Sequence, residues 1–251
     1  GVEGDYVQCN LTTKIGESTN ENIPRVIGNS MEYLTLRVSH ELNLVGPSFS
    51  SVAACATSLL AVHTAVQNLR LGDCSVAIAG GSRVEVSIAN GYISAIDGML
   101  SPSGVIRPFD AKADGTVFGQ GTGVVVLKRL KDAIKDGNQI HGVILGTGFS
   151  NDGKPDDKKS FIAPAASGQA RAIRKAIQDA GISPRTIGLN ECHGTATLAG
   201  DPIEVQALKS VHREAGNEKG YCALSSIKGN VGHLGAAAGC LLYTSDAADE
   251  S

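Results

Sequence analysis

GPSFSSVAACATSLL, residues 46–60, is the stretch of this 251-residue chain on which the fold prediction is built. Phe49 opens a short extended run over residues 49–53, Cys55 marks a turn, and a helix is expected over residues 56–71. The helix is indicated by apolar residues that recur at helical spacing: Leu59, Val62, Val66 and Leu69. A strand that feeds a helix through a tight turn is the basic unit of α/β proteins.

Cys55 is a candidate nucleophile because of this position. A cysteine at the start of a helix lies beside unpaired N–H groups and the positive end of the helix dipole, and both favour the thiolate over the thiol. The small neighbours Ala54, Ala56 and Ser58 leave room for a substrate carbonyl. The alternative is a structural cysteine buried at a strand–helix junction, since free cysteine is among the most buried residue types.

Composition excludes several classes of function. Hydrophobic residues make up 42% and charged residues 19% of the chain, which is ordinary for a globular protein. A net charge of −3 and an aromatic content of 4% give no reason to expect a nucleic acid or an anionic membrane as partner. No apolar run reaches the roughly 18 residues that a membrane span needs.

The cysteine pattern argues against both a disulfide scaffold and a zinc site. None of the cysteines shows C-x-x-C spacing, and they are scattered through a chain of middling size. A reducing cytoplasm is therefore the expected location. The six cysteines are Cys9, Cys55, Cys74, Cys192, Cys222 and Cys240.

Strands and helices are expected to alternate along the chain. Two helices carry start signals: Ser167 is a plausible N-cap of one, and Asp201 of the other, with Pro202 and Glu204 completing the pattern. The alternation favours an α/β fold with largely parallel, covered sheets. The expected helices cover residues 33–42, 130–136, 167–180 and 201–215, and the expected strands cover residues 75–80, 121–128, 141–147, 187–191 and 223–225.

Two histidines follow expected strands in the same manner as Cys55. His193 lies in ECHGTATLAGDPIE (residues 191–204), and His233 lies in SSIKGNVGHLGAAAG (residues 225–239). Loops after strands are where α/β folds usually carry their chemistry. Each histidine alone is more simply a hydrogen-bonding residue without a catalytic role. The repetition of one arrangement at three loops favours a shared site.

These three motifs resemble the active-site motifs of the β-ketoacyl synthases, and the ketosynthase domains of type I polyketide synthases in particular. RPFDAKADGT and GVVVLKRL are also similar to that family, so the resemblance spans nearly the whole chain. It implies a thiolase-type fold, with two related halves whose sheets lie between helical layers, usually as a homodimer. The halves are expected at residues 1–136 and 137–240, with the start of the first and the end of the second missing. Residues 241–251 do not resemble the family and are expected to be a non-native tail.

The resemblance implies roles for the three central residues. Cys55 is the nucleophile that accepts an acyl group, as a thiolate at a helix start can do near neutral pH. His193 and His233 match the two histidines that hydrogen-bond the thioester carbonyl of a malonyl-type extender and promote its decarboxylation. The implied reaction is a decarboxylative Claisen condensation in polyketide or fatty acid biosynthesis.

Four further residues match supporting positions of the family. Lys228 is implied to support the site electrostatically, Glu204 is the acidic residue of the helix after the first histidine loop, and Thr195 and Thr197 are hydroxyls near the substrate's pantetheine arm. No metal or organic cofactor is implied. The expected partner is an acyl carrier protein that bears a phosphopantetheine thioester, with neither nucleic acid nor a membrane involved.

Three positions depart from the common family pattern: Ala56 stands in place of serine, Cys192 of alanine and Ala196 of glycine. These are small changes that concern tuning more than activity. The truncated ends matter more, because a glycine-rich loop that supplies an oxyanion donor in the family is expected beyond residue 239. The isolated chain is therefore expected to be less competent than its parent protein.

Three alternatives compete with the condensing enzyme. A degradative thiolase shares the fold but would use a second cysteine where this chain has His233. A Cys–His hydrolase needs only one histidine, with an orienting carboxamide or carboxylate. A non-condensing, carrier-binding or chain-length subunit would have lost Cys55 or a histidine. Because Cys55, His193 and His233 are all present, a condensing enzyme is favoured for the parent protein.

Overall fold

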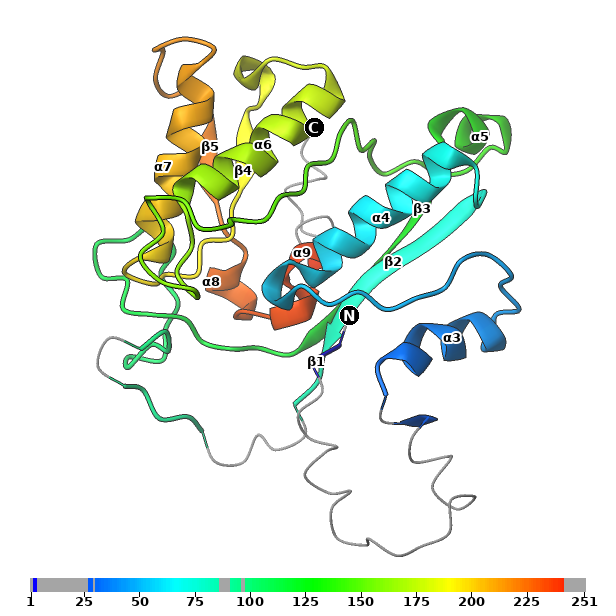
Figure 1. The fold of residues 1–251 in the computed structure, drawn as a ribbon, viewed down its shortest axis with the longest axis horizontal. Coiled ribbons are helices and arrows are strands. Elements are labelled where there is room, and N and C mark those ends of the chain that lie inside the picture. Colours follow the sequence, from blue (N-terminus) through cyan, green and yellow to red (C-terminus); the bar gives the residue numbers. More distant parts are fainter. Residues whose placement is uncertain (1, 4–26, 29, 86–90, 96–97, 242–251) are drawn as a thin grey trace, which may run out of the picture. The chain divides into compact units, whose positions relative to one another are not determined.

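The computed structural model describes residues 2–3, 27–28, 30–85, 91–95 and 98–241 (Figure 1). The chain forms two compact units that alternate along the sequence. The first comprises Gly1–Gly91, Gln120–Gln139 and Leu234–Glu250, and the second comprises Tyr92–Gly119, Ile140–His233 and Ser251. The division into two halves near residue 136 stays a prediction, and the proposed tail, Leu241 apart, lies outside the described residues.

The first unit contains a three-stranded sheet in the order β1 (Val2–Glu3), β2 (Val76–Arg83), β3 (Gly121–Lys128). β1 runs parallel to β2, whereas β2 and β3 are antiparallel along their whole length. The prediction of largely parallel sheets is therefore wrong for the longest pair. Only parallel neighbours require a helical crossover, and the described part of the segment between β2 and β3 contains no helix.

Helix α4 (Thr57–Leu71) packs against β2 and β3, as Figure 1 shows. Val62 on the helix is 1% exposed and Ala79 on β2 is 5% exposed, so the core of this unit lies between them. β2 also contacts a short turn, η3 (Gly235–Ala237). A Cβ on Gly81 would lie 2.4 Å from the Ala236 carbonyl oxygen, so only glycine permits this approach.

The segment before α4 differs from its prediction. Residues 49–53 are irregular rather than a strand. The Ala53 N–H donates to the Thr57 hydroxyl at 2.9 Å instead of to a neighbouring strand, and this bond fixes a turn. The predicted helix over residues 56–71 is confirmed as α4, preceded by the short turn η1 (Ala54–Ala56).

Arg129 forms hydrogen bonds at the carboxyl end of α4. Its Nη1 donates to the carbonyl oxygens of Leu69 at 2.8 Å and Cys74 at 3.0 Å, and its Nε donates to Asp132 at 2.6 Å. The guanidinium thus joins the last turn of α4, the loop before β2 and the start of α5 (Leu130–Lys135).

Replacing Arg129 should destabilise the first unit. In Arg129→Ala the two carbonyl oxygens lose charged donors, and we expect the free energy of unfolding to fall by about 1–3 kcal/mol. Urea unfolding monitored by circular dichroism measures this change. Lys131→Ala, at an exposed position on the same helix, is the matched control and should stay within about 0.5 kcal/mol of the original. Equal stabilities for the two variants would contradict the role given to Arg129.

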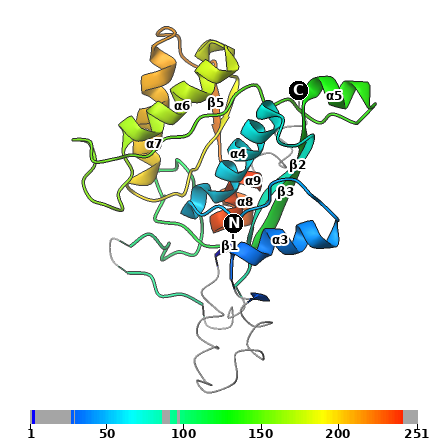
Figure 2. The same ribbon diagram turned by 45° about the vertical axis from the view of Figure 1, so that its right-hand side comes forward.

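The second unit is built around α6 (Ala166–Ala180) and α7 (Gly200–Arg213), which lie side by side in both Figure 1 and Figure 2. β4 (Leu189–Glu191) and β5 (Ala223–Ser225) form a parallel pair. The predicted type of both strands and both helices is confirmed. The core between the helices consists of Ala170, Ala207 and Val211, against which Ala166, Ile173 and Ile177 pack.

The predicted strand over residues 141–147 is absent, because this segment packs against α6 instead of joining a ladder. The Thr147 N–H donates to the Asp179 carboxylate at 2.8 Å. A Cβ on Gly148 would lie 2.0 Å from the Ala172 carbonyl oxygen, and one on Gly146 would lie 2.3 Å from a backbone nitrogen of the same helix. The glycines that flank Thr147 therefore allow the backbone of this segment to lie close to α6.

The start of α6 uses a different cap from the one predicted. Ser167 is inside the helix, and its N–H and hydroxyl donate to Asp157 at 2.9 and 2.8 Å. These two bonds lower the pKa of Asp157. A carboxylate ten residues away thus satisfies a free N–H of the first helical turn, which is the function that the Ser167 side chain was predicted to serve.

The remaining helices are short. The predicted helices near residues 33–42 and 130–136 are confirmed within a residue at each end. No helix in the described ranges has the length and apolar character to cross a membrane. The elements are α3 (Glu32–Glu41), α5, η2 (Pro184–Thr186), α8 (Lys228–Val231) and α9 (Ala238–Leu241).

Candidate active site

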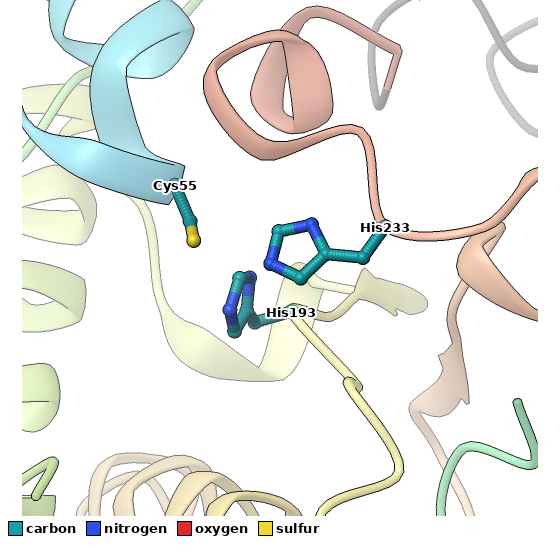
Figure 3. A group of neighbouring side chains, drawn as sticks. All are labelled: Cys55, His193 and His233. Atoms are coloured by element: carbon teal, nitrogen blue, oxygen red, sulfur yellow. The ribbon is translucent and has the colours of Figure 1, made fainter. Parts of the chain in front are cut away.

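Cys55 lies in the first unit, in the turn η1 directly before α4, and its half-buried thiol forms no disulfide. Figure 3 shows its side chain projecting from this turn. The preceding residue, Ala54, has a φ of 47°, which a residue other than glycine rarely adopts. The Thr57 hydroxyl donates to the Ala54 carbonyl oxygen at 2.7 Å and holds the turn in place. Strained backbone of this kind is concentrated at functional sites.

All the other predicted site residues lie in the second unit. His193 follows β4, and one carboxylate accepts hydrogen bonds from two N–H groups of its loop. The N–H groups of His193 and Gly194 donate to the two oxygens of Glu204, at 2.6 and 2.8 Å. Gly194 has a φ of 45°, and a Cβ there would lie 2.6 Å from the Ser226 side chain. Glycine and Glu204 together fix the direction in which His193 leaves the loop.

Asp201 holds the next part of the same loop. Its carboxylate accepts hydrogen bonds from the N–H of Ala196 at 3.0 Å and of Phe109 at 2.7 Å. Both donors have left-handed backbone, with φ of 59° and 60°. Glycine adopts this left-handed conformation without the strain that it imposes on Ala196 and Phe109.

The predicted capping role of Asp201 and Glu204 is wrong. The N-cap of α7 is Ala199, without a side-chain hydrogen bond. Asp201 is 5% exposed, and both carboxylates reach across to backbone N–H groups of preceding loops. The same residue types at the same spacing satisfy N–H groups outside the helix instead of those in its first turn.

Half-buried Glu204 and buried Lys228 are the charged groups near His193. Burial raises the pKa of Glu204, while the N–H groups of Gly194 and His193 and the charge of Lys228 oppose this. Lys228 is only 2% exposed at the start of α8. A second carboxylate, Glu191, accepts the N–H of Ile227 at 2.7 Å and ties the end of β4 to this helix. No signal in the sequence pointed to this role of Glu191.

His233 is 1% exposed and is fixed at its backbone. Its N–H donates to Val117 at 2.8 Å, and its carbonyl oxygen accepts from Gly119 at 3.0 Å. Its ring contacts that of Phe118, with centroids 5.3 Å apart, and that of His193, with centroids 5.2 Å apart and an angle of 87°. Figure 3 shows the two imidazoles edge to face. The structure thus brings the two predicted histidines together from separate loops.

Thr195 and Thr197 continue the histidine loop. Their hydroxyl oxygens are 3.1 Å apart, and that of Thr197 accepts the N–H of Gly200 at 3.1 Å. Thr195 is 8% exposed. The Thr197 hydroxyl therefore has a structural use at the start of α7, and contact of either residue with a pantetheine arm stays a prediction.

Cys192, next to His193, is not a competing nucleophile. Burial, together with the charges of Glu204 and Glu191, raises the pKa of its thiol to about 12. Burial also raises the pKa of Cys222 and of Cys240. Because the thiolate is the reactive form, these three cysteines are expected to be inert near neutral pH.

The pKa of His193 favours its neutral form near neutral pH. Desolvation of the ring, followed by the charge of Lys228, lowers the pKa of His193 to about 4, although the residue as a whole is exposed. A neutral imidazole keeps one N–H as a donor and carries no charge that would bind a carboxylate.

The lowered pKa of His193 predicts that the stability of the folded chain depends on pH. NMR titration of the imidazole signals measures this pKa directly. Because the pKa is lower in the folded state than the usual 6.5, the unfolded chain takes up a proton that the folded chain excludes as the pH falls from 6.5 toward 4. The stabilising contribution of neutral His193 is therefore complete above pH 6.5 and is lost toward pH 4. In Lys228→Met the pKa of His193 should rise. Titration of His193 near 6.5 in the original chain would contradict this account.

Comparison with solved structures shows which known proteins share the fold of this chain. The chain resembles the solved ketosynthase twelve of the bacillaene polyketide synthase of Bacillus amyloliquefaciens, with a TM-score of 0.90 and 32% identity over 98% of this chain and 43% of that one. It also resembles the ketosynthase of module 6 of the bacillaene synthase of Bacillus subtilis 168, with a TM-score of 0.79 and 39% identity over 89% of this chain and 40% of that one. The mixed α/β architecture is thus the ketosynthase, or thiolase-like, fold.

Two sequence families of protein domains also match the chain. Residues 2–133 match the β-ketoacyl synthase N-terminal domain and residues 141–245 match the C-terminal domain. The chain therefore belongs to the β-ketoacyl synthase family, as the motifs predicted.

Curated relatives are polyketide synthases. One component of the phenolphthiocerol/phthiocerol polyketide synthase of Mycobacterium tuberculosis is 44% identical over 84% of this chain and 14% of its own length. Polyketide synthase PksN of Bacillus subtilis is 36% identical over 91% of this chain and 4% of its own length. The chain thus spans a small part of these relatives, and less than half of the solved ketosynthases.

Proposed function

We propose that this chain carries the condensing chemistry of a β-ketoacyl synthase: decarboxylative Claisen condensation of a Cys55-bound acyl group with a malonyl-type thioester on a carrier protein. The observation that carries the proposal is the pair of imidazoles, His193 and His233, set edge to face with ring centroids 5.2 Å apart. Family membership and Cys55 before α4 support it. The proposal requires the two units to present Cys55 to the histidines.

The first step is acyl transfer. The Cys55 thiolate attacks the carbonyl carbon of an acyl thioester, a carbon–sulfur bond forms, and the carrier's phosphopantetheine thiolate leaves and takes up a proton. The N–H groups at the start of α4 are suited to hydrogen-bond the oxyanion of the tetrahedral intermediate, since a helix N-terminus favours negative charge. The turn at Ala54 fixes the direction of the Cys55 side chain.

The second step is decarboxylation. The bond between the carboxylate carbon and the α-carbon of the malonyl thioester breaks, CO2 leaves, and the electron pair forms an enolate. In the proposal, His193 and His233 donate Nε2–H bonds to the enolate oxygen, where the negative charge develops. Neutrality of His193 serves this step, because an imidazolium would stabilise the carboxylate that must be lost.

The third step is carbon–carbon bond formation. The enolate α-carbon attacks the carbonyl carbon of the Cys55 thioester, and the Cys55 thiolate leaves. The product is a β-ketoacyl thioester on the carrier protein, and the thiolate is regenerated. This sequence of steps balances without a metal or organic cofactor.

The supporting residues act through the histidines. In this scheme desolvation of the ring and the charge of Lys228 keep His193 neutral, Glu204 holds its backbone, and Thr195 and Thr197 lie beside the pantetheine arm. We also propose the finer expectations of the family resemblance: two related halves with layered sheets and helices, a homodimer, an acyl carrier protein as partner, and a cytoplasmic location.

Peptide-mapped mass spectrometry after incubation with an acyl thioester tests the proposal. We would use the chain itself and a chimera in which its residues 2–241 replace the matching segment of the module 6 ketosynthase of Bacillus subtilis. Acylation confined to Cys55, followed by consumption of a malonyl thioester that fails in His193→Ala and His233→Ala, is the expected result. A folded chimera that is not acylated would overturn the proposal and favour a non-condensing carrier-binding protein. Acylation of the chimera alone would uphold the residue roles and assign the failure to the span of the chain.

A further inference from the structure

A pocket of about 510 Å³ lies in the second unit at the carboxyl end of α7. Its walls come from the last two turns of that helix and from the loop that leads to β5. None of the residues assigned to condensation lines it. Its volume is within the range of small-molecule sites, about 300–1,000 Å³. The lining residues on which the argument depends are Lys209, His212, Arg213, Glu218, Lys219 and Tyr221.

The charge of this pocket is predominantly positive. Lys209 and Arg213 stand one helical turn apart on α7, and Lys219 comes from the loop. Within the described part of the chain none of these three has an ion-pair partner. The single carboxylate of the lining, Glu218, is already paired with Arg185 outside it. Cations held near one another without counter-charges favour an anionic ligand.

The polar groups of the pocket wall are also donors. The Nε2 of His212 lies 3.1 Å from the amide nitrogen of Asn190, which only donates, so Nε2 accepts and the ring proton is on Nδ1. Nδ1 lies 2.7 Å from the Tyr221 hydroxyl oxygen and donates to it. Burial lowers the pKa of His212, in agreement with a neutral ring. The Tyr221 proton has no acceptor among the described residues and is available to a ligand.

Arg185, which is not part of the lining, contacts two of the lining residues. The Arg185 guanidinium lies over the Tyr221 ring, 4.3 Å from its centroid. Its Nη1 is buried and has no hydrogen-bond partner within the described residues. Such an unmet donor is rare in folded proteins and calls for an acceptor. The pocket lining itself therefore combines three cations and one hydroxyl proton with a single carboxylate, which Arg185 already pairs.

We propose that this pocket binds a phosphorylated small molecule, with the phosphate oxygens on Lys209, Lys219 and Arg213 and with the Tyr221 hydroxyl as a neutral donor. A phosphate group is favoured because it carries up to two charges and several acceptor oxygens, which donors on two different walls can share. The inference goes beyond the condensing reaction and does not depend on it.

Titration of the ¹⁵N-labelled 251-residue chain with pyrophosphate at fixed ionic strength tests the site. We expect saturable shifts of amide signals within residues 209–221. Lys209→Gln/Lys219→Gln should weaken binding at least about tenfold, and Tyr221→Phe about three- to tenfold. The matched control is Lys131→Gln/Lys135→Gln, which removes two lysines from exposed positions on α5 and should bind like the original. Circular dichroism verifies that each variant is folded.

Two results would overturn the proposal. One is equal pyrophosphate affinity in the pocket and control double variants, which would mean general attraction to surface lysines. The other is an absence of shifts within residues 209–221 of the folded chain, the result expected if only an acidic protein surface fits the pocket. Neither result bears on acylation of Cys55, so failure here is distinguishable from failure of the condensing proposal.

Discussion

Cys55→Ala is expected to lower condensation at least about a thousandfold, because removal of a nucleophile eliminates the covalent intermediate altogether. Decarboxylation of a malonyl thioester should persist, since in the proposed scheme it depends on the imidazoles and not on the thiol. Release of CO2 and formation of β-ketoacyl product, measured in parallel on the chimera, separate the two steps.

The controls for this prediction lie in the same chain. Cys74→Ala removes another half-buried thiol of the first unit and should leave condensation unchanged. His193→Ala should show the opposite pattern to Cys55→Ala, with acylation retained and CO2 release lost. Condensation by the folded Cys55→Ala variant at more than a few per cent of the original rate would refute the assignment of the nucleophile.

Glu204→Ala is expected to have the largest effect on stability, with the free energy of unfolding lowered by about 3 kcal/mol. The variant leaves the N–H groups of His193 and Gly194 without acceptors and removes a carboxylate whose charge acts together with that of buried Lys228. Because the same bonds orient His193, CO2 release should fall at least about a hundredfold. Chemical denaturation and the CO2 assay measure the two effects.

Glu204→Gln and Glu214→Ala make this prediction specific. The amide of Gln keeps one acceptor oxygen, so its effect should lie between those of Glu and Ala. Glu214, near the end of the same helix, forms an exposed ion pair with Arg174, and its loss should cost no more than about 1 kcal/mol. If Glu204→Ala were as mild as Glu214→Ala, the loop would not depend on the carboxylate.

The sequence predicted the type and bounds of an element well where a long apolar pattern covered the whole element. β3 coincides with the predicted strand at residues 121–128, and α4 begins within a residue of its prediction, because their apolar patterns are sustained. The strand over residues 141–147 failed because a short apolar run is compatible with packing on a helix as well as with a ladder. The two glycines beside Thr147 were the available signal, and they indicate close backbone contact.

The candidate site was predictable in its residue types and less so in its supports. The position of His193 after a strand and the proximity of His233 followed from topology. The roles of Asp201 and Glu204 did not, because a carboxylate in the first turn of a helix has the same sequence signature whether it caps that helix or a distant loop. The structure was needed to show that Asp201 accepts the N–H groups of Ala196 and Phe109, both at left-handed backbone positions.

The interleaving of the two units has a consequence for the order of assembly during synthesis. Cys240 donates its backbone N–H to the Ser58 hydroxyl at 3.0 Å, and a Cβ on Gly239 would lie 2.5 Å from the Leu59 side chain. The helix that begins just after Cys55 therefore acquires its final neighbours only when the last-made part of the described chain has left the ribosome. The turn that carries Cys55 is translated early, but its packing is completed late. Nascent chains halted before residue 240 should therefore lack this packing, however long they are given to fold.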